Sequence, residues 1–292
     1  MGKILAPETM QCAAGLSRRD FLQTGSLAML GIGLSGLAGI NPHGEARKGT
    51  GPEVKTDISA VKALTFDVFG TVVDWRTTVS EEVSRLAKAK GVKIDGARFA
   101  DAWRAGYKPT MDRIRRGELP WMNLDAVHRM LLDRLLGEFS VTGLTEAEKD
   151  HLNRIWHRLK PWPDSVSGLG RLRKRFTVAT LSNGNMALLT NLAKNAGLTW
   201  DCILSAELAR HYKPDKEVYQ MAADLLGLRP EQIMMVAAHK EDLRAARSIG
   251  FKTAFVRRPL EFGAEGHPDL EPDPSFDVLA DDFTDLAGQL GA

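Results

Sequence analysis

Asp67-Val-Phe-Gly-Thr71 follows directly on the apolar run of residues 61–66, and these two segments decide the fold. An apolar run of this kind predicts a strand that is covered on both faces of its sheet. Gly70 supplies the backbone freedom for a sharp exit from that strand. Asp67 therefore stands beyond the carboxyl end of a buried strand, where open α/β sheets bind ligands. Taken alone, Asp67 could equally be a turn residue whose carboxylate accepts from backbone amides.

Strand-like and helix-like segments alternate along the rest of the chain. The further strand-like runs cover residues 176–181, 202–205, 233–238, 253–256 and 276–279. This alternation predicts an α/β fold with a doubly wound, mostly parallel, Rossmann-like sheet. Between the first strand and Trp162, apolar residues recur at helical spacing and predict an inserted helical cap. We expect residues 58–74 and 161–292 to form the core and residues 75–160 to form the cap.

Polar residues also stand at the ends of later strands. Ser182 and Asn183 follow the second strand and precede a helix, whose free N-terminal amides favour an anion. Lys213 precedes Pro214, which suits the first position of a helix and forces Lys213 into an extended conformation. Lys213 can therefore reach across the strand ends.

His239 and Asp242 follow the fourth strand. Each polar cluster alone has an ordinary explanation, such as helix capping for Ser182, a solvated ammonium for Lys213 and a charge favoured by the helix dipole for Asp242. Because the carboxyl ends of parallel strands meet at one edge of a sheet, their recurrence is a stronger signal than any single cluster. We expect one shared site.

The order Asp-x-x-Gly-Thr, Ser-Asn, Lys-Pro and Asp resembles the haloacid dehalogenase superfamily over residues 61–290. The details resemble the type II, or L-2-haloacid, dehalogenases. The stretches that carry this closer resemblance are Phe66-Asp-Val-Phe-Gly-Thr-Val-Val-Asp74, Trp162-Pro-Asp164, Leu181-Ser-Asn-Gly184, Tyr212-Lys-Pro-Asp215 with Tyr219, and Val236-Ala-Ala-His239 followed by Asp242. The resemblance implies the haloacid dehalogenase fold and the hydrolysis of (S)-2-haloacids to 2-hydroxyacids.

Two positions separate this chain from the phosphatases of the superfamily. Those enzymes carry an aspartate two residues after the nucleophile and a metal-ligating aspartate in the fourth motif, where this chain has Phe69 and Ala238. Mg²⁺ prefers several hard oxygen ligands, and only Asp67 and Asp242 would remain to supply them. We therefore expect no metal site and no cofactor. A monoanionic haloacid also needs less charge neutralisation than a phosphate ester does.

The resemblance implies a covalent mechanism on Asp67. Its carboxylate attacks the halogen-bearing carbon, expels halide and forms an ester, which water then hydrolyses. A cation within a few ångströms, such as Lys213, would lower the pKa of Asp67 by roughly 1–3 units and keep it ionised.

Four other residues are expected to assist this reaction. Thr71 and Ser182 would orient the reacting groups through hydrogen bonds. Asp242, or His239 together with Asp242, is the candidate for activating water, and the sequence leaves open which of them acts. His239 and Phe69 stand where the better-known dehalogenases usually carry asparagine and tyrosine, so the substrate is not fixed by the resemblance.

Substrate contacts are expected from both the cap and the core. Ala102-Trp-Arg-Ala105 resembles the family segment whose arginine handles the substrate carboxylate or the departing halide, which indicates Arg104. A surface arginine paired with a carboxylate is the alternative. Trp121 is a candidate for lining the pocket, although packing inside the cap would explain it equally. The remaining substrate-binding candidates are Phe69, Asn183 as a halide contact, and Tyr219.

The amino terminus resembles an export signal. Ser17-Arg-Arg-Asp-Phe-Leu22 matches the twin-arginine pattern, and an apolar run follows at residues 26–40. We expect residues 1–46 to hold the signal peptide and the start of a linker, and residues 47–57 to complete the linker, with export by the twin-arginine machinery to the periplasm or outside the cell. Because a spanning helix needs roughly 20 apolar residues, a stable membrane anchor is not expected.

The charge composition argues against a nucleic-acid partner. The chain has 39 Lys and Arg against 37 Asp and Glu, whereas binding to a phosphate backbone requires a basic face. The expected partner is a small-molecule 2-haloacid. The sequence leaves open whether the protein forms a homodimer. Two other functions also stay open: a related hydrolase acting on a phosphate ester or another small acid, and an exported binding module without turnover.

Overall fold

The structure, a computed structural model, describes residues 57–292. The expected signal peptide and nearly all of the expected linker lie outside these residues. No helix in the described range is both long and apolar enough to cross a membrane. The elements in chain order are β1 (Ala63–Phe66), β2 (Val73–Asp74), α1 (Trp75–Lys90), α2 (Gly96–Arg115), α3 (Leu124–Glu138), α4 (Glu146–Asn153), η1 (Arg154–Arg158), β3 (Lys160–Pro161), α5 (Ser165–Leu172), β4 (Thr177–Ser182), α6 (Met186–Ala196), β5 (Cys202–Ser205), α7 (Ala206–Ala209), α8 (Lys216–Leu226), η2 (Pro230–Gln232), β6 (Ile233–Ala237), α9 (Lys240–Ser248), β7 (Lys252–Val256), β8 (Val278–Ala280) and α10 (Phe283–Gln289).

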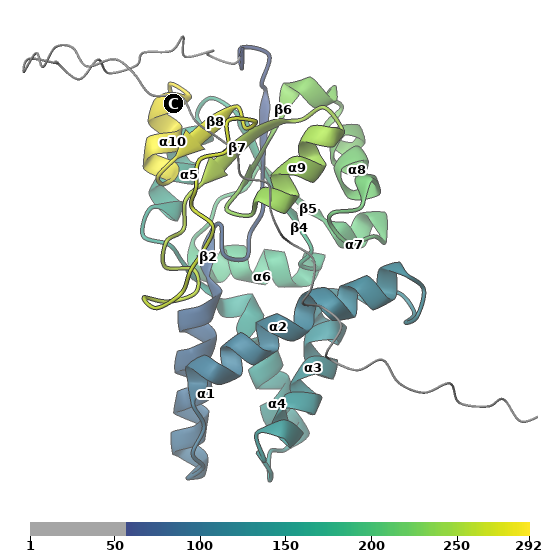
Figure 1. Ribbon diagram of the computed structural model, residues 1–292, viewed down its shortest axis with the longest axis vertical. Helices are drawn as coiled ribbons and strands as arrows, with labels where there is room; N and C mark the ends of the chain where they lie inside the picture. Colours follow the sequence, from purple (N-terminus) through teal and green to yellow (C-terminus); the bar gives the residue numbers. More distant parts are fainter. Residues whose placement is uncertain (1–56) are drawn as a thin grey trace, which may run out of the picture. The chain divides into compact units, whose positions relative to one another are not determined.

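Six parallel strands form the central sheet in the order β5-β4-β1-β6-β7-β8 (Figure 1). β1 lies in the middle, and Phe66 pairs with Thr180 of β4 on one side and with Val236 of β6 on the other. All four residues of β1 are buried. The prediction of a doubly wound, parallel α/β sheet is therefore confirmed, and the strand that precedes Asp67 is central.

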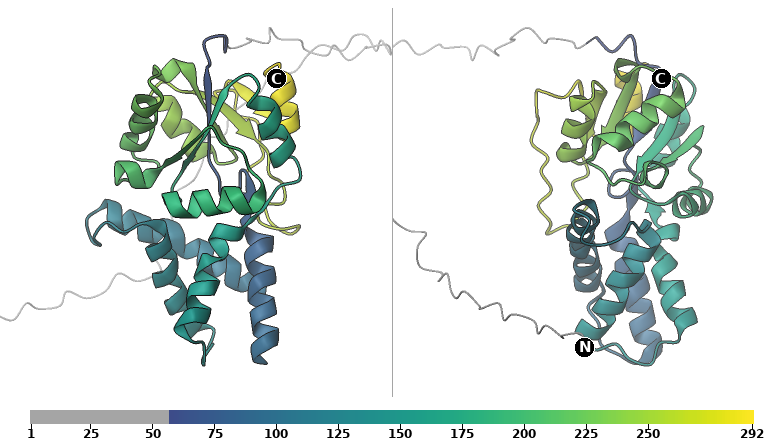
Figure 2. Two further views of the ribbon diagram at one scale, coloured as in Figure 1. Left: turned by 180° about the vertical axis from the view of Figure 1, so that it is seen from behind. Right: turned by 90° about the vertical axis from the view of Figure 1, so that its right-hand side faces the viewer.

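Helices cover both faces of the sheet (Figure 2). α8 and α9 pack together on one face, while α5 and α10 pack together on the other. The ring of Phe283 in α10 meets Phe66 of β1 edge-on, with 5.4 Å between centroids. On the opposite face, Tyr219 of α8 packs against Phe251 at 6.2 Å. Because both faces are covered, the central strands are largely apolar and almost wholly buried instead of alternating between apolar and polar residues.

The start of α8 differs from the sequence prediction. The helix begins at Lys216, and Asp215 is its N-cap residue, with the extended backbone of a cap (φ −62°, ψ 135°). Pro214 therefore lies outside the helix and not at its first position, which corrects the prediction. The Lys213–Pro214 peptide bond is cis. Lys213 nevertheless lies at the sheet edge, where its ammonium contacts Asp67 just after β1.

Helices α1 to α4 and the short helix η1 lie between β2 and β3 in the sequence and form a helical insert, below the sheet in Figure 1. Asp74, Asp95 and Asn123 cap the amino ends of α1, α2 and α3, each accepting from a backbone amide of the first turn. The insert and the sheet share one continuous hydrophobic core. Phe69, just after β1, meets Trp156 of η1 edge-on at 5.9 Å.

Candidate active site

Asp67 stands directly after β1, and three side chains contact its carboxylate. The Thr71 hydroxyl donates to Oδ2 at 2.8 Å, Lys213 Nζ donates to Oδ1 at 3.0 Å, and His239 Nδ1 lies 3.0 Å from Oδ2. Burial by itself would raise the pKa of Asp67, but Lys213 and His239 hold that pKa well below its usual range. Asp67 is thus a buried carboxylate that stays ionised, as a carboxylate nucleophile must.

Lys213 links Asp67 to Asp242. Its Nζ donates to Asp242 Oδ2 at 2.5 Å, and the Tyr219 hydroxyl donates to Asp242 Oδ1 at 2.6 Å. Burial disfavours an ammonium group, yet the carboxylates of Asp242 and Asp67 raise the pKa of Lys213 above its usual value. Both oxygens of Asp242 are therefore engaged by donors.

A second chain of contacts runs from Asp67 through His239 to Glu261. His239 Nε2 lies 3.0 Å and 3.1 Å from the two oxygens of Glu261, and Trp75 Nε1 donates to Glu261 Oε1 at 3.2 Å. Burial disfavours a charge on His239, but Glu261 and Asp67 raise the pKa of the imidazole to about 10. His239 is therefore an imidazolium held between two carboxylates.

Glu261 was missed by sequence reasoning. It lies in the irregular connection between β7 and β8, residues 257–277, where no motif marks it. The only local signal is a carboxylate between two large apolar residues, Leu260 and Phe262. The side chain is nevertheless 2% exposed. Gly70 leaves the space for it, because a Cβ on Gly70 would lie 2.1 Å from Glu261 Oε1.

The turn after β4 brings Asn183 to the cavity, while Ser182 is buried within the turn. Asn183 Oδ1 accepts from the backbone amide of Lys213 at 2.8 Å, and its side chain lines the cavity. Ser182 is fully buried, and its Oγ accepts from the amide of Gly184 at 3.1 Å. Ser182 therefore supports the turn, and its expected role in orienting the reacting groups stays a prediction.

These groups open onto a cavity of about 530 Å³ between the core and the helical insert. This volume lies within the range of small-molecule sites. The lining residues from the core include Asp67, Phe69, Asn183, Lys213, His239, Asp242 and Glu261, and those from the insert include Arg104, Tyr107 and Met111. The structure thus brings most of the predicted site residues to one cavity.

Arg104 supplies a cation on the side of the insert. Its guanidinium lies over the ring of Tyr107 at 4.6 Å and over the ring of Trp75 at 5.6 Å. No carboxylate within residues 57–292 forms an ion pair with Arg104, so the alternative of a paired surface arginine is not supported. Tyr107 was missed by the sequence analysis, although it lies three residues from Arg104 on the same helix and therefore shares its face.

Trp121 and Tyr219 do not line the cavity. The Trp121 ring packs on Tyr212, with 4.8 Å between centroids, and the Tyr212 hydroxyl donates to the carbonyl of Met122 at 2.8 Å. These contacts join the α2–α3 loop to the core. Tyr219 supports Asp242 instead. The structure therefore places both residues in supporting positions, away from the expected substrate contacts.

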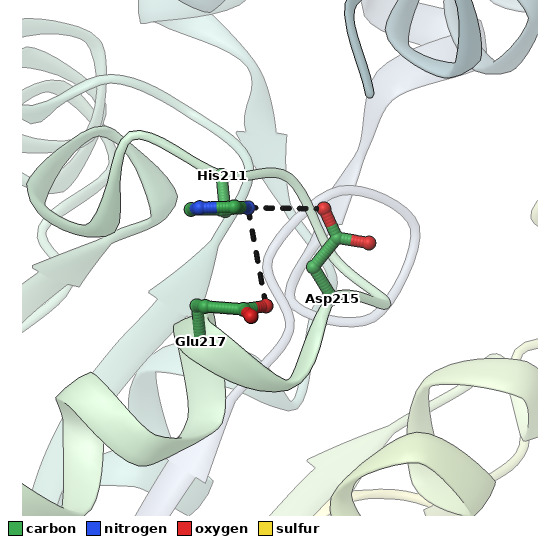
Figure 3. A group of neighbouring side chains, drawn as sticks. All are labelled: His211, Asp215 and Glu217. Carbon is green, nitrogen blue, oxygen red and sulfur yellow. Dashed lines mark hydrogen bonds and ion pairs between the residues drawn. The ribbon is translucent and has the colours of Figure 1, made fainter. Parts of the chain in front are cut away.

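One group of side chains within residues 57–292 has the spacing of a metal site, namely His211, Asp215 and Glu217 before and at the start of α8 (Figure 3). His211 Nδ1 lies 3.3 Å from Asp215 Oδ2 and 3.9 Å from Glu217 Oε2. Arg115 of α2 pairs with Asp215 at 2.6 Å. A metal ion would have to compete with this guanidinium, so the cluster is best described as an ion-pair network.

Comparisons with known proteins agree with the site. A family model described as haloacid dehalogenase-like hydrolase matches residues 61–250. The (S)-2-haloacid dehalogenase 1 of Pseudomonas sp. (strain CBS-3) is 30% identical over 216 residues, which cover 68% of this chain and 85% of that protein. Two solved structures, an L-2-haloacid dehalogenase and a defluorinating L-2-haloacid dehalogenase, are each 46% identical, with TM-scores of 0.76 and 0.77. They match 79% and 80% of this chain and 99% and 96% of their own chains. The chain therefore belongs to the haloacid dehalogenase superfamily and, within it, to the L-2-haloacid dehalogenase family.

Proposed function

We propose that this protein is a metal-independent (S)-2-haloacid dehalogenase that forms an ester on Asp67. The observation that carries the proposal is the ionised, buried carboxylate of Asp67 at a cavity whose opposite wall presents Arg104. A nucleophile and a cation facing the same small cavity suit a small organic anion with a leaving group.

The two oxygens of Asp67 are not equivalent. Oδ2 accepts from Thr71 and faces His239, whereas Oδ1 accepts from Lys213 as its one partner among residues 57–292. Oδ1 therefore keeps a free lone pair and is assigned as the attacking oxygen. It forms a bond to the halogen-bearing carbon while the carbon–halogen bond breaks and its electron pair leaves with the halide. Holding the reactants in line could supply up to about 7–11 kcal/mol of the barrier.

Water completes the reaction by attacking the carbonyl carbon of the Asp67 ester. Oδ2 is then the carbonyl oxygen, and Thr71 already donates a hydrogen bond to it. Cleavage of the ester restores the carboxylate and releases the 2-hydroxyacid, with one proton and one halide ion per turnover. Thr71 thus stabilises the negative charge that develops on this oxygen, as an oxyanion-hole donor does.

Arg104 binds the substrate carboxylate or the departing halide in this proposal. Its guanidinium faces the cavity and is held by the rings of Tyr107 and Trp75. A charge-assisted hydrogen bond of this kind contributes about 1.5–3 kcal/mol. Asn183 lines the same cavity and is the proposed polar contact for halide.

Independence from metal is supported by the residues around Asp67. Phe69 and Ala238 line the cavity where superfamily phosphatases carry carboxylates, and the Lys213 ammonium lies between Asp67 and Asp242. A phosphate monoester would bring nearly two negative charges to this site without metal ions to neutralise them. A phosphatase reaction is therefore the less favoured alternative.

Halide release tests the function. The purified protein is incubated with (S)-2-chloropropionate, its enantiomer, chloroacetate and fluoroacetate in the presence of a chelator, and free halide is measured. Fluoroacetate belongs in the panel because one relative at 46% identity is described as defluorinating. We expect chloride from the (S) enantiomer without added metal and no release by Asp67→Asn. Phosphatase activity that needs Mg²⁺, with no halide from any substrate, would refute the proposal, and tight binding without turnover would favour a binding module.

Location and assembly are proposed from the sequence alone. Ser17-Arg-Arg-Asp-Phe-Leu22 and the apolar run after it support export by the twin-arginine machinery to the periplasm or beyond, and family resemblance supports a homodimer. Replacing both Arg18 and Arg19 by lysine should retain the full-length protein in the cytoplasm. Export of that variant at the normal level would refute the first proposal, and a monomeric mass in solution would refute the second.

A further inference from the structure

The structure narrows the choice of the group that activates water. Asp242 was one candidate, but its Oδ2 accepts from Lys213 and its Oδ1 accepts from Tyr219. Each oxygen of Asp242 keeps a second lone pair, but taking a proton from water would weaken the contacts with Lys213 and Tyr219 that hold this carboxylate in place. Asp242 is therefore better suited to keeping Lys213 in place than to acting as a base.

His239 lies where a base for ester hydrolysis should lie. Its Nδ1 is 3.0 Å from Asp67 Oδ2, so a water molecule attacking the adjacent carbonyl carbon falls within hydrogen-bond reach of the ring. On the other side of the ring, Nε2 contacts both oxygens of Glu261. We propose that Glu261 is a positioning residue that holds His239 as the general base for hydrolysis of the Asp67 ester. This proposal rests on the function proposed above.

Glu261 determines which nitrogen of His239 can accept a proton from water. A carboxylate can only accept hydrogen bonds, so its contact with Nε2 requires the proton to stay on that nitrogen. When His239 is neutral, its lone pair must then be on Nδ1, which faces Asp67. Trp75 Nε1 donates to Glu261 Oε1 and fixes the carboxylate in turn. The arrangement follows the logic of nucleophile, base and orienting carboxylate.

Ester formation changes the charge on His239. At rest the imidazolium lies between two carboxylates, and these keep it protonated. Once Asp67 becomes a neutral ester, one of the two stabilising charges is gone, so the imidazolium loses its Nδ1 proton to solvent. The neutral ring then takes one proton from the attacking water while the water oxygen bonds to the ester carbonyl carbon. The Cγ–Oδ1 bond breaks, the second water proton goes to the departing oxygen of the hydroxyacid, and the Asp67 carboxylate is restored beside an imidazolium. One proton leaves per turnover, which balances the conversion of water and haloacid into hydroxyacid and halide.

No other described charge takes over the part of Glu261. The charged side chains that act on His239 and Glu261 are Asp67 at the end of β1, Lys213 through Asp67, and Arg104 from α2. Lys213 and Arg104 are cations and cannot accept the Nε2 proton. Glu261 is therefore the residue whose removal should impair hydrolysis without removing the nucleophile.

The test compares Glu261→Gln with wild type in rapid-mixing experiments with (S)-2-chloropropionate. Free chloride, the hydroxyacid and the intact mass of the quenched protein are measured in each sample. We expect Glu261→Gln to release one chloride per enzyme at about the wild-type rate, then to stall as an Asp67 adduct. Hydrolysis should slow by about 10²-fold or more, the scale of a general base. Glu265→Gln, an exposed glutamate in the same connection, is the matched control and should behave as wild type.

The outcomes separate this proposal from the proposed function. Normal hydroxyacid formation by Glu261→Gln without an adduct would overturn the role of Glu261, and so would a loss of the first chloride. A wild-type protein that releases no chloride would instead refute the dehalogenase function.

A measurement on the wild type covers the case in which Glu261→Gln does not fold. In a single turnover with a pH indicator, proton release should follow chloride and precede the hydroxyacid. Proton release that coincides with the hydroxyacid would overturn the proposal, because the base would then not lose its proton on ester formation.

Discussion

At the scale of residues, the site depends on one cation shared by two buried carboxylates. Lys213 contacts Asp67 and Asp242 in a part of the protein where all three side chains are nearly inaccessible. The motif order in the sequence predicted Asp67, Lys213 and Asp242 as members of one site, because each follows a strand. It could not predict that Asp242 accepts from both Lys213 and Tyr219, since that depends on side-chain geometry.

Replacing Lys213 by methionine should move the acid limb of the pH profile. The pKa of Asp67 is depressed in the folded protein, so Asp67 is ionised above a low pH and activity is lost only as the pH falls through that value. Without the cation, the pKa of Asp67 rises by roughly 1–3 units, and the acid limb of kcat/KM for (S)-2-chloropropionate shifts upward by the same amount. Lys216→Met, an exposed lysine nearby, should leave the limb unchanged. An unshifted limb in Lys213→Met would contradict the role of the cation.

At the scale of elements, the turn after β1 and the β7–β8 connection fit together through Gly70. Gly70 has a positive φ of 83°, and a Cβ there would overlap Glu261 Oε1. Gly117 also has a positive φ, 74°, but a Cβ there meets nothing within 4 Å. Comparing substitutions at these two glycines therefore separates the cost of backbone strain from the cost of displacing Glu261.

Gly70→Ala should therefore cost more than Gly117→Ala. Backbone strain alone costs about 1–3 kcal/mol in either variant. Gly70→Ala must also push Glu261 away from His239, so we expect a larger loss of stability in urea unfolding and slow ester hydrolysis. Equal effects of the two substitutions on both stability and hydrolysis would show that the glycine is required only for its conformation.

The β7–β8 connection is held to the core by a buried ion pair. Arg258 donates two hydrogen bonds of 2.8 Å to Asp164 and a third, of 2.7 Å, to the carbonyl of Thr71. Arg258→Met leaves a carboxylate without its partner and should lower the free energy of unfolding by about 3–5 kcal/mol. Arg257→Met breaks the exposed pair with Asp281 and should change it by about 1 kcal/mol or less. Similar losses in the two variants would contradict this difference.

The elements were predictable from the sequence where the apolar pattern is regular. All six strands of the sheet lie within two residues of their predicted positions, because strands in a covered sheet are largely apolar. The start of α8 and the place of Trp121 were not predictable, since Asp215 takes the cap position and the Trp121 ring finds Tyr212 in a distant segment. Glu261 lies in a connection without periodicity, so only the fold brings it to His239.

At the scale of the whole molecule, the active-site cavity lies between the sheet domain and the helical insert. The sheet supplies the groups that form and break the ester, and the insert supplies Arg104 and Tyr107 opposite them. This division explains why the strand-end motifs predicted the reaction better than they predicted the substrate contacts. The residues expected to select the substrate lie on helices of the insert, and the apolar spacing of these helices reflects mainly how they pack.

Isotope labelling of one turnover tests most directly whether Asp67 forms an ester. The enzyme, in excess over (S)-2-chloropropionate, turns over once in water enriched in oxygen-18, and the product and the peptide containing Asp67 are analysed by mass spectrometry. Because water attacks the ester carbonyl, the heavy oxygen should appear in the Asp67 carboxylate, and the first product should carry ordinary oxygen. Heavy oxygen in the first product, with an unlabelled Asp67, would mean that water attacks the substrate directly and would contradict the covalent mechanism.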